Sequence, residues 1–180
     1  VNWSGDATGT LNPISVTMNS NKTVTAQFSQ ANRAPELASI GNKSVNENTK
    51  LEFTVSATDA DGNSLTYSAT GLPTGATFSA STRTFSWTPT YSQSGTYNVT
   101  FNVTDGSLTD SETITITVAD IKYTLSITST NGTVTKNPNQ ANYEPGTQVQ
   151  LTATANSGYH FTGWSGDVTG TVTTLNLKMD

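Results

Sequence analysis

The same eight-residue motif occurs near both ends of this chain, and this repeat constrains the fold more than any other feature. The first copy reads Trp3-Ser4-Gly5-Asp6-Ala7-Thr8-Gly9-Thr10, and the second, 161 positions later, reads Trp164-Ser165-Gly166-Asp167-Val168-Thr169-Gly170-Thr171. At the same offset, alternating apolar residues correspond: Ile14 to Leu175, Val16 to Leu177 and Met18 to Met179. Such alternation marks the buried face of a strand. Both ends are therefore predicted to be the same kind of module.

Neither copy of that module is complete within the chain. Residues 1–19 align with residues 162–180, so the second copy stops before the segment that follows Met18 in the first. We therefore expect residues 1–30 to be the C-terminal part of one module and residues 121–180 to be the N-terminal part of the next, lacking its last strand. This arrangement predicts a segment of a longer tandem array.

The composition favours strands and disfavours several functions. Threonine accounts for 36 of the 180 residues, and threonine prefers strands to helices. The net charge is −5 and the eight Lys and Arg residues form no cluster, which disfavours binding to nucleic acid or to a membrane surface. The chain has no apolar stretch of the roughly twenty residues needed to cross a bilayer. The predicted fold class is all-β, with no membrane insertion in this segment.

The C-terminal third is predicted to form a small antiparallel sheet. Tyr123, Leu125 and Ile127 alternate with polar residues, and Asn131-Gly132 is a strong hairpin signal before residues 133–135. Further strands are expected at residues 149–153 and 159–161.

This order of motifs resembles the internalin-type B repeat, a β-grasp-like module that occurs in tandem in bacterial surface and secreted proteins. The residues that carry the resemblance are Asn131-Gly132-Thr133-Val134, Tyr143 with Pro145-Gly146, residues 149–153, Gly158-Tyr159-His160-Phe161 and Gly163-Trp164-Ser165-Gly166-Asp167. The family closes with a strand like Lys22-Thr23-Val24-Thr25-Ala26-Gln27-Phe28. The resemblance implies that residues 20–28, or their equivalent, complete the C-terminal module.

Residues 31–120 are predicted to form a β-sandwich. About seven short strands with Gly and Pro turns are expected, at residues 43–45, 51–57, 65–69, 77–79, 84–88, 95–104 and 112–118. The last two are predicted to be the central hairpin of the core, with Trp87 filling the place of a disulfide that a cysteine-free chain does not have.

This middle segment resembles cadherin-like and immunoglobulin-like domains of bacterial adhesins. The resemblance rests on Asn32-Arg33-Ala34-Pro35, Val45-Asn46-Glu47-Asn48, Ala57-Thr58-Asp59-Ala60-Asp61-Gly62, Asp105-Gly106 and residues 115–120. It implies calcium at the junction with the preceding module, held by Asp59, Asp61, Asp105 and Asn32, because calcium prefers several oxygen ligands. Glu47 and Asp120 are candidates for the opposite junction. The alternative is that the Asp-Gly segments are turn formers that cap their own backbone.

The remaining chemistry-bearing residues give no catalytic site. Without cysteine, thiol catalysis and thiolate metal sites are excluded, and His160 is the single imidazole. No phosphate-binding loop, nucleophile elbow or paired carboxylates are evident. We therefore expect no enzyme activity and no cofactor besides calcium. Trp3, Trp164 and Tyr159 could stack on sugars, although core packing is the favoured interpretation.

The favoured hypothesis is a structural repeat segment of a large exported bacterial adhesin or extracellular fibre. It would space or link through tandem modules, or through strand addition in which residues 20–28 of a neighbouring copy complete a sheet. The chain is then expected at the bacterial surface or outside the cell, with a glycan or host surface as a further partner. The alternative is a carbohydrate-binding module attached to a secreted polysaccharide-degrading enzyme.

Overall fold

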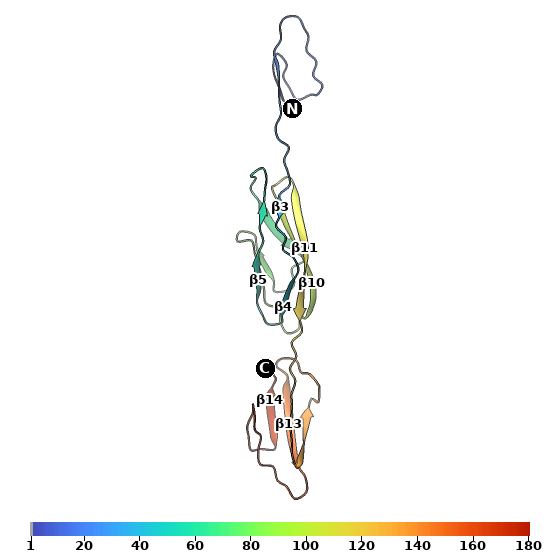
Figure 1. The fold of residues 1–180 in the computed structure, drawn as a ribbon, viewed down its shortest axis with the longest axis vertical. Coiled ribbons are helices and arrows are strands. Elements are labelled where there is room, and N and C mark those ends of the chain that lie inside the picture. Colours follow the sequence, from blue (N-terminus) through green and yellow to red (C-terminus); the bar gives the residue numbers. More distant parts are fainter. Residues whose placement is uncertain (1) are drawn as a thin grey trace.

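The computed structural model describes residues 2–180 and contains strands and turns, with no helix in that range. The predicted all-β class is therefore confirmed. Three units follow one another along the long axis of the molecule (Figure 1): a two-stranded N-terminal unit, a central β-sandwich and a C-terminal sheet. Single segments of chain connect them, and the sandwich lies between the N-terminal and C-terminal units.

The central unit consists of two main sheets. The larger has the order β4-β11-β10-β7, formed by β4 (Lys43–Asn46), β11 (Thr109–Ala119), β10 (Gly95–Thr104) and β7 (Thr66–Thr70). The smaller has the order β5-β9-β8, formed by β5 (Leu51–Thr54), β9 (Thr84–Trp87) and β8 (Thr77–Ser79). A short pair, β3 (Glu36–Leu37) with β6 (Ala57–Thr58), was not predicted. The β10–β11 hairpin lies at the centre of the larger sheet, as its alternating Val and Ile residues indicated.

The core of the sandwich joins inward-facing residues from both sheets. Trp87 is 1% exposed, packs edge-on against Tyr97 and donates its indole N–H to the Thr74 carbonyl at 3.2 Å. Phe85 stacks on Phe53 at 5.0 Å, and both rings meet Phe101 edge-on. The burial of Trp87 confirms the prediction that this residue fills the core. Its indole N–H keeps a hydrogen-bond partner, so burying the ring leaves no polar group unsatisfied.

The C-terminal unit is the antiparallel sheet β12-β13-β14, formed by β12 (Gly132–Asn137), β13 (Gln148–Ala155) and β14 (Thr174–Lys178). Its core contains Tyr143, Val149, Leu151 and Met179. Tyr143 is fully buried, and its hydroxyl donates to the Pro138 carbonyl at 3.1 Å. Asn131, at φ 58°, lies in the turn that leads into β12, but the predicted hairpin does not form there, because the segment before the turn is not a strand.

Two strands predicted for this unit are absent. Residues 123–130 alternate correctly but form no strand; only Tyr123 makes an isolated bridge, with Tyr143. Residues 159–161 also lack strand pairing. Alternation decides which side chains are buried, and Leu125 and Ile127 are indeed partly buried, but a strand also needs a neighbouring edge to bond. Residues 124–128 make no backbone hydrogen bond to any other part of residues 2–180.

The two copies of the repeated motif have the same local conformation. The N–H of Trp3 donates to the Gly9 carbonyl at 3.0 Å, and that of Trp164 donates to the Gly170 carbonyl at 2.7 Å. Both indole N–H groups donate to the carbonyl eight residues later, Leu11 and Val172, each at 2.8 Å. The repeat predicted from the sequence therefore extends to the backbone.

The surroundings of the two copies differ. The N-terminal unit pairs β1 (Asn2–Gly5) with β2 (Val24–Gln27) and has nothing equivalent to β12 and β13. Met18 is consequently 73% exposed, whereas its repeat equivalent Met179 is 7% exposed. The C-terminal unit has β12 and β13 but nothing equivalent to β2. Each copy thus contains the part of the module that the other lacks.

Candidate functional site

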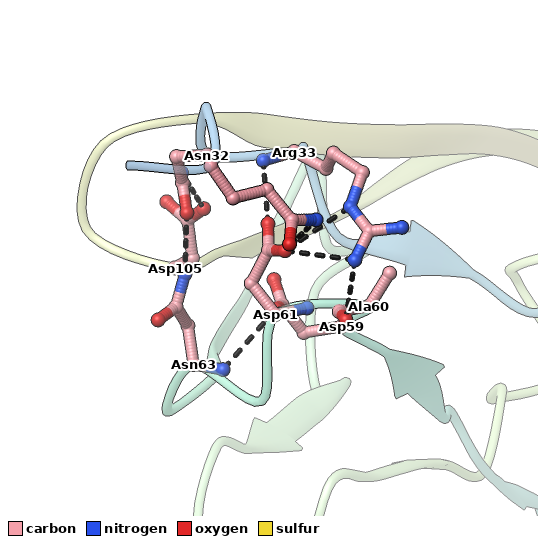
Figure 2. Close-up of polar contacts among 8 residues, drawn as sticks. Asn32, Arg33, Asp59, Ala60, Asp61, Asn63 and Asp105 are labelled. Carbon is pink, nitrogen blue, oxygen red and sulfur yellow. Dashed lines mark hydrogen bonds and ion pairs between the residues drawn. The ribbon is translucent and has the colours of Figure 1, made fainter. Parts of the chain in front are cut away.

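The four residues predicted to bind calcium lie together at the N-terminal junction of the sandwich (Figure 2). Asn32 belongs to the linker between β2 and β3. Asp59 and Asp61 lie in the loop between β6 and β7, and Asp105 begins the turn of the β10–β11 hairpin. Two loops of the sandwich therefore present carboxylates to the incoming chain.

Two of the carboxylates shape their own turns. Asp59 Oδ1 accepts the N–H groups of Asp61 at 2.8 Å and Asn63 at 3.1 Å. Asp105 Oδ1 accepts the N–H groups of Ser107 at 2.7 Å and Leu108 at 2.6 Å. These contacts are the ones expected of turn-forming Asp residues, the alternative considered for the sequence.

The other carboxylate atoms hold the linker. The Arg33 guanidinium donates to Asp61 Oδ1 from Nη2 at 2.8 Å and from Nε at 3.1 Å, and the Arg33 backbone N–H donates to Asp61 Oδ2 at 2.7 Å. Arg33 also reaches the Ala60 carbonyl (Figure 2). Asn32 donates to Asp105 Oδ2 at 2.6 Å and accepts from Asn63 at 2.6 Å. Asn32 is therefore tied to both loops, and Arg33 to the β6–β7 loop alone.

The electrostatics of the junction follow from these contacts. The pKa of Asp61 is lowered, first by the hydrogen bond from the Arg33 side chain and then by that from its backbone N–H. The pKa of Asp105 is lowered first by the Leu108 N–H and then by Asn32. The pKa of Arg33 is raised, chiefly by its hydrogen bond to Asp61. The network is thus built for ionised carboxylates and a charged guanidinium.

One carboxylate oxygen at this junction is free to bind a metal ion, whereas the neighbouring carboxylates already have hydrogen-bond partners. Asp59 Oδ2 is buried and has no hydrogen-bond partner. However, Asp61 is occupied by Arg33, and within residues 2–180 no three acidic or imidazole side chains are grouped closely enough to hold an ion. The calcium site stays a prediction. Arg33 was quoted in the sequence motif but not recognised as a partner of Asp61, 28 residues away.

The C-terminal junction contains a second tie. Glu47 is 1% exposed, and its Oε2 accepts the N–H of Ile121 at 3.0 Å, whereas its Oε1 has no partner. Lys122 lies 3.1 Å from Asp120 and 3.3 Å from Glu144, which belongs to the C-terminal unit. These acceptors raise the pKa of Lys122, Asp120 first. The sequence pointed to Glu47 and Asp120 here but not to Lys122.

The aromatic residues do not make one binding platform. Trp3 and Trp164 belong to units at opposite ends of the molecule, and each is half-buried with its indole N–H bonded to its own unit. Trp164 packs against the C-terminal core and lies 5.3 Å from Phe161. Tyr159 is 56% exposed. The geometry favours the packing interpretation for Trp164.

Comparisons with solved structures give distant similarities of fold. The human Protocadherin-24 EC1-2 structure aligns with a TM-score of 0.45 at 14% identity, over 83% of this chain and 96% of that one. Drosophila N-cadherin EC1-3 aligns with a TM-score of 0.41 at 15% identity, over 50% and 35%. An alpha-galactosidase/melibiase structure from Bacteroides fragilis aligns with a TM-score of 0.42 at 17% identity, over 48% of this chain and 18% of its own length. No curated protein matches the chain.

Family comparisons match the two ends of the chain to one family and the middle to another, in agreement with the sequence repeat at the two ends. Residues 34–119 match the family described as "Putative Ig domain". Residues 1–32 and 123–180, half of the chain, match the "Divergent InlB B-repeat domain". Domains of these two kinds are typical of extracellular and surface proteins, and no helix in residues 2–180 could span a membrane. The chain belongs to the divergent InlB B-repeat family, with one Ig-like domain placed between two parts of the repeat.

Proposed function

We propose that this chain is a structural repeat segment of a large exported bacterial adhesin or extracellular fibre, in which it spaces or links neighbouring modules. The observation that carries the proposal is the in-line arrangement of two like end units around a sandwich (Figure 1). Side chains hold both connecting segments: Arg33 on Asp61 at one junction, and Ile121 on Glu47 at the other. A spacer needs this resistance to bending at its joints.

The strand order of the sandwich supports a load-bearing role. β4 and β11 are neighbours and run parallel, with Lys43 opposite Ile116 and Asn46 opposite Ala119. The chain enters at one end of the sandwich and leaves at the other (Figure 1). Tension between the ends therefore pulls β4 and β11 in opposite directions along their length. All hydrogen bonds of the pair share that load, whereas tension across one end would break them one at a time.

Force spectroscopy with cysteine handles tests this role, and the absence of native cysteine makes the handles specific. Handles at Ser29→Cys and Thr124→Cys flank the sandwich and load β4 and β11 in shear. Handles at Thr49→Cys and Thr124→Cys follow the C-terminal ends of both strands and load the same pair by peeling. We expect a severalfold higher unfolding force in the first geometry. Equal forces in the two geometries would refute a load-bearing sandwich.

We further propose that calcium stiffens the N-terminal junction. Asp59, Asp61, Asp105 and Asn32 would supply the oxygen ligands, with Asp59 Oδ2 the atom that lacks a partner in the protein. Binding requires Asp61 to release Arg33, so the ion would exchange one positive charge for another. At one hundred times its Kd, calcium should raise the Tm of the sandwich by about 10 °C relative to EDTA.

The matched variants are Asp59→Asn, which should abolish the calcium-dependent rise in Tm, and Asp167→Asn in the C-terminal unit, which should retain it. A Tm that is the same in calcium and in EDTA would overturn the calcium proposal and leave the spacer role untouched.

A further inference from the structure

The C-terminal unit contains an open groove of about 550 Å³. One wall is formed by residues 123–128 and the other by residues 163–168. The apolar side chains lining it include Leu125, Ile127, Leu151, Trp164, Leu175 and Leu177. An apolar groove between two extended segments has the shape and chemistry of a missing strand position.

Both walls have backbone groups without partners. Residues 124–128 make no backbone hydrogen bond with any described residue. On the other wall the N–H of Trp164 bonds to Gly170, and the chain forms no further ladder. Leu125 and Ile127 nevertheless point into the apolar core. A strand inserted between the walls would pair with two edges at once.

The N-terminal copy of the repeat shows which segment occupies the equivalent position. There β2 pairs antiparallel with β1, with Trp3 opposite Ala26 and Gly5 opposite Val24. Asp6 continues the contact: its Oδ2 accepts the N–H of Thr23 at 2.8 Å, and its Oδ1 lies 3.6 Å from Lys22 Nζ. The repeat equivalent of Asp6 is Asp167, which is exposed and lines the groove.

The glycine before each of these acids confirms that the position is filled in one copy and open in the other. A Cβ placed on Gly5 would clash with the carbonyl oxygen of Thr23, the residue before β2, whereas a Cβ on Gly166 would meet nothing within 4 Å. Ala7, which follows Asp6, is 8% exposed, and its equivalent Val168 is 42% exposed. The C-terminal copy therefore has the same local backbone conformation but no strand equivalent to β2 covering it.

We propose that this groove binds residues 20–28 of a second copy of the chain as an added strand. The inference rests on the proposed function and names its partner. The pairing repeats the β1–β2 register, so Trp164 lies opposite Ala26 of the second copy and Gly166 lies opposite its Val24. Asp167 then receives Thr23 and Lys22 of the second copy, as Asp6 does within one chain.

Within residues 2–180 the groove is not filled from the same copy, because residues 20–28 belong to the unit at the opposite end of the molecule (Figure 1). Addition therefore joins the N-terminal unit of one copy to the C-terminal unit of another. A head-to-tail contact of this kind can repeat from copy to copy, and it produces a fibre unless the rotation between copies closes a ring.

The donor strand gains contacts by this exchange. In its own unit, β2 pairs with one strand, and a two-stranded ribbon alone is marginally stable. Val24 begins that strand and Phe28 directly follows it, and these two apolar residues are 37% and 79% exposed. In the groove the same strand meets two unpaired edges, and its apolar residues meet Leu125, Ile127 and Leu177. When β2 moves from its own unit into the groove of another copy, it pairs with two strand edges instead of one. Its apolar side chains, exposed before, become covered.

The experiment adds a synthetic peptide, Ser-Asn-Lys-Thr-Val-Thr-Ala-Gln-Phe, to the full chain and follows the indole N–H signal of Trp164 by NMR. We expect saturable binding that shifts Trp164 and leaves Trp87 unchanged. Asp167→Lys should weaken binding about tenfold, because it removes a charge-assisted acceptor and repels Lys22. A peptide with Lys22→Asp should regain affinity for the Asp167→Lys chain. Asp6→Lys is the matched control and should bind the unaltered peptide as tightly as the native chain.

Analytical ultracentrifugation of the full chain completes the test. We expect oligomers that grow with concentration, are shortened by the peptide and need about tenfold higher protein concentration in Asp167→Lys. No peptide binding would overturn the proposal, and so would binding by a chain that stays monomeric at millimolar concentration, because the second copy would then not be the donor. Either failure leaves the load-bearing role of the sandwich to be decided by its own force measurement.

Discussion

The matched residues Met18 and Met179 offer a direct test of how the repeat is divided between the two ends. They occupy equivalent positions 161 residues apart, yet Met179 is 7% exposed and Met18 is 73% exposed. Met179 packs with Tyr143, Val149 and Leu151. If the N-terminal copy lacks that part of the core, truncation at the two positions should have very different consequences.

Replacing a buried Met by Ala removes apolar contacts and leaves a cavity. For Met179→Ala we expect a loss of about 3 kcal/mol from the free energy of unfolding of the C-terminal unit. With a denaturant slope of about 1 kcal/mol per molar urea for a unit of this size, the urea midpoint should fall by about 3 M. For Met18→Ala, at an exposed position, the change should stay within about 0.5 kcal/mol.

NMR can follow each unit separately, because Trp3, Trp87 and Trp164 lie one in each unit and each donates its indole N–H to a carbonyl. Urea titration of the three indole signals gives three midpoints. Met179→Ala should lower the Trp164 midpoint alone, or move that signal to its unfolded position without urea. Met18→Ala should leave all three midpoints in place at concentrations where the chain is monomeric. Equal losses at both positions would refute the division of the module.

Two further predictions concern the linker and the repeated glycines. The pKa values of Asp61 and Asp105 are lowered, so their contacts are complete above the ordinary carboxyl value of 3.8 and are lost as pH falls through the lowered values. Hydrogen exchange of the Asn32 side-chain amide and of the Arg33 backbone N–H should therefore speed up only below pH 3.8. Faster exchange near pH 6 would contradict this assignment. Gly5→Ala and Gly166→Ala introduce the same strain at φ +91° and +107°, but only the Gly5 variant clashes with Thr23, so it should displace the Trp3 indole signal while Gly166→Ala leaves that of Trp164 in place. Similar displacement in both variants would show that strain alone is responsible.

The parts of the fold that could be predicted depend on short-range patterns. Alternation located β10 and β11, and the offset between Trp3 and Trp164 revealed the shared backbone conformation of the ends. Residues 123–130 show why such patterns fail. Their side chains have the period of a strand, but strand formation depends on a partner that sequence periodicity cannot supply. The β3–β6 pair was not predicted, because each strand has two residues and an alternating pattern of apolar and polar residues cannot be recognised in so short a segment.

The candidate site could be predicted only in outline. The resemblance to adhesin domains pointed to Asn32, Asp59, Asp61 and Asp105, and these residues lie near one another at the junction, while their role as metal ligands stays a prediction. It did not reveal that Arg33 neutralises Asp61, because that ion pair depends on how the linker crosses the loop. Lys122 was missed for the same reason, since its partner Glu144 lies in the next unit.

The joints of this molecule depend on charge, whereas its units depend on apolar burial, and salt acts on the two in opposite directions. Dissolved ions screen partly exposed pairs such as Lys122 with Glu144, while excluded salts such as sulfate strengthen hydrophobic cores. An array of these units should therefore bend more easily in brine than in fresh water, even as each unit becomes harder to melt. Its persistence length would then report the ionic strength of the surroundings.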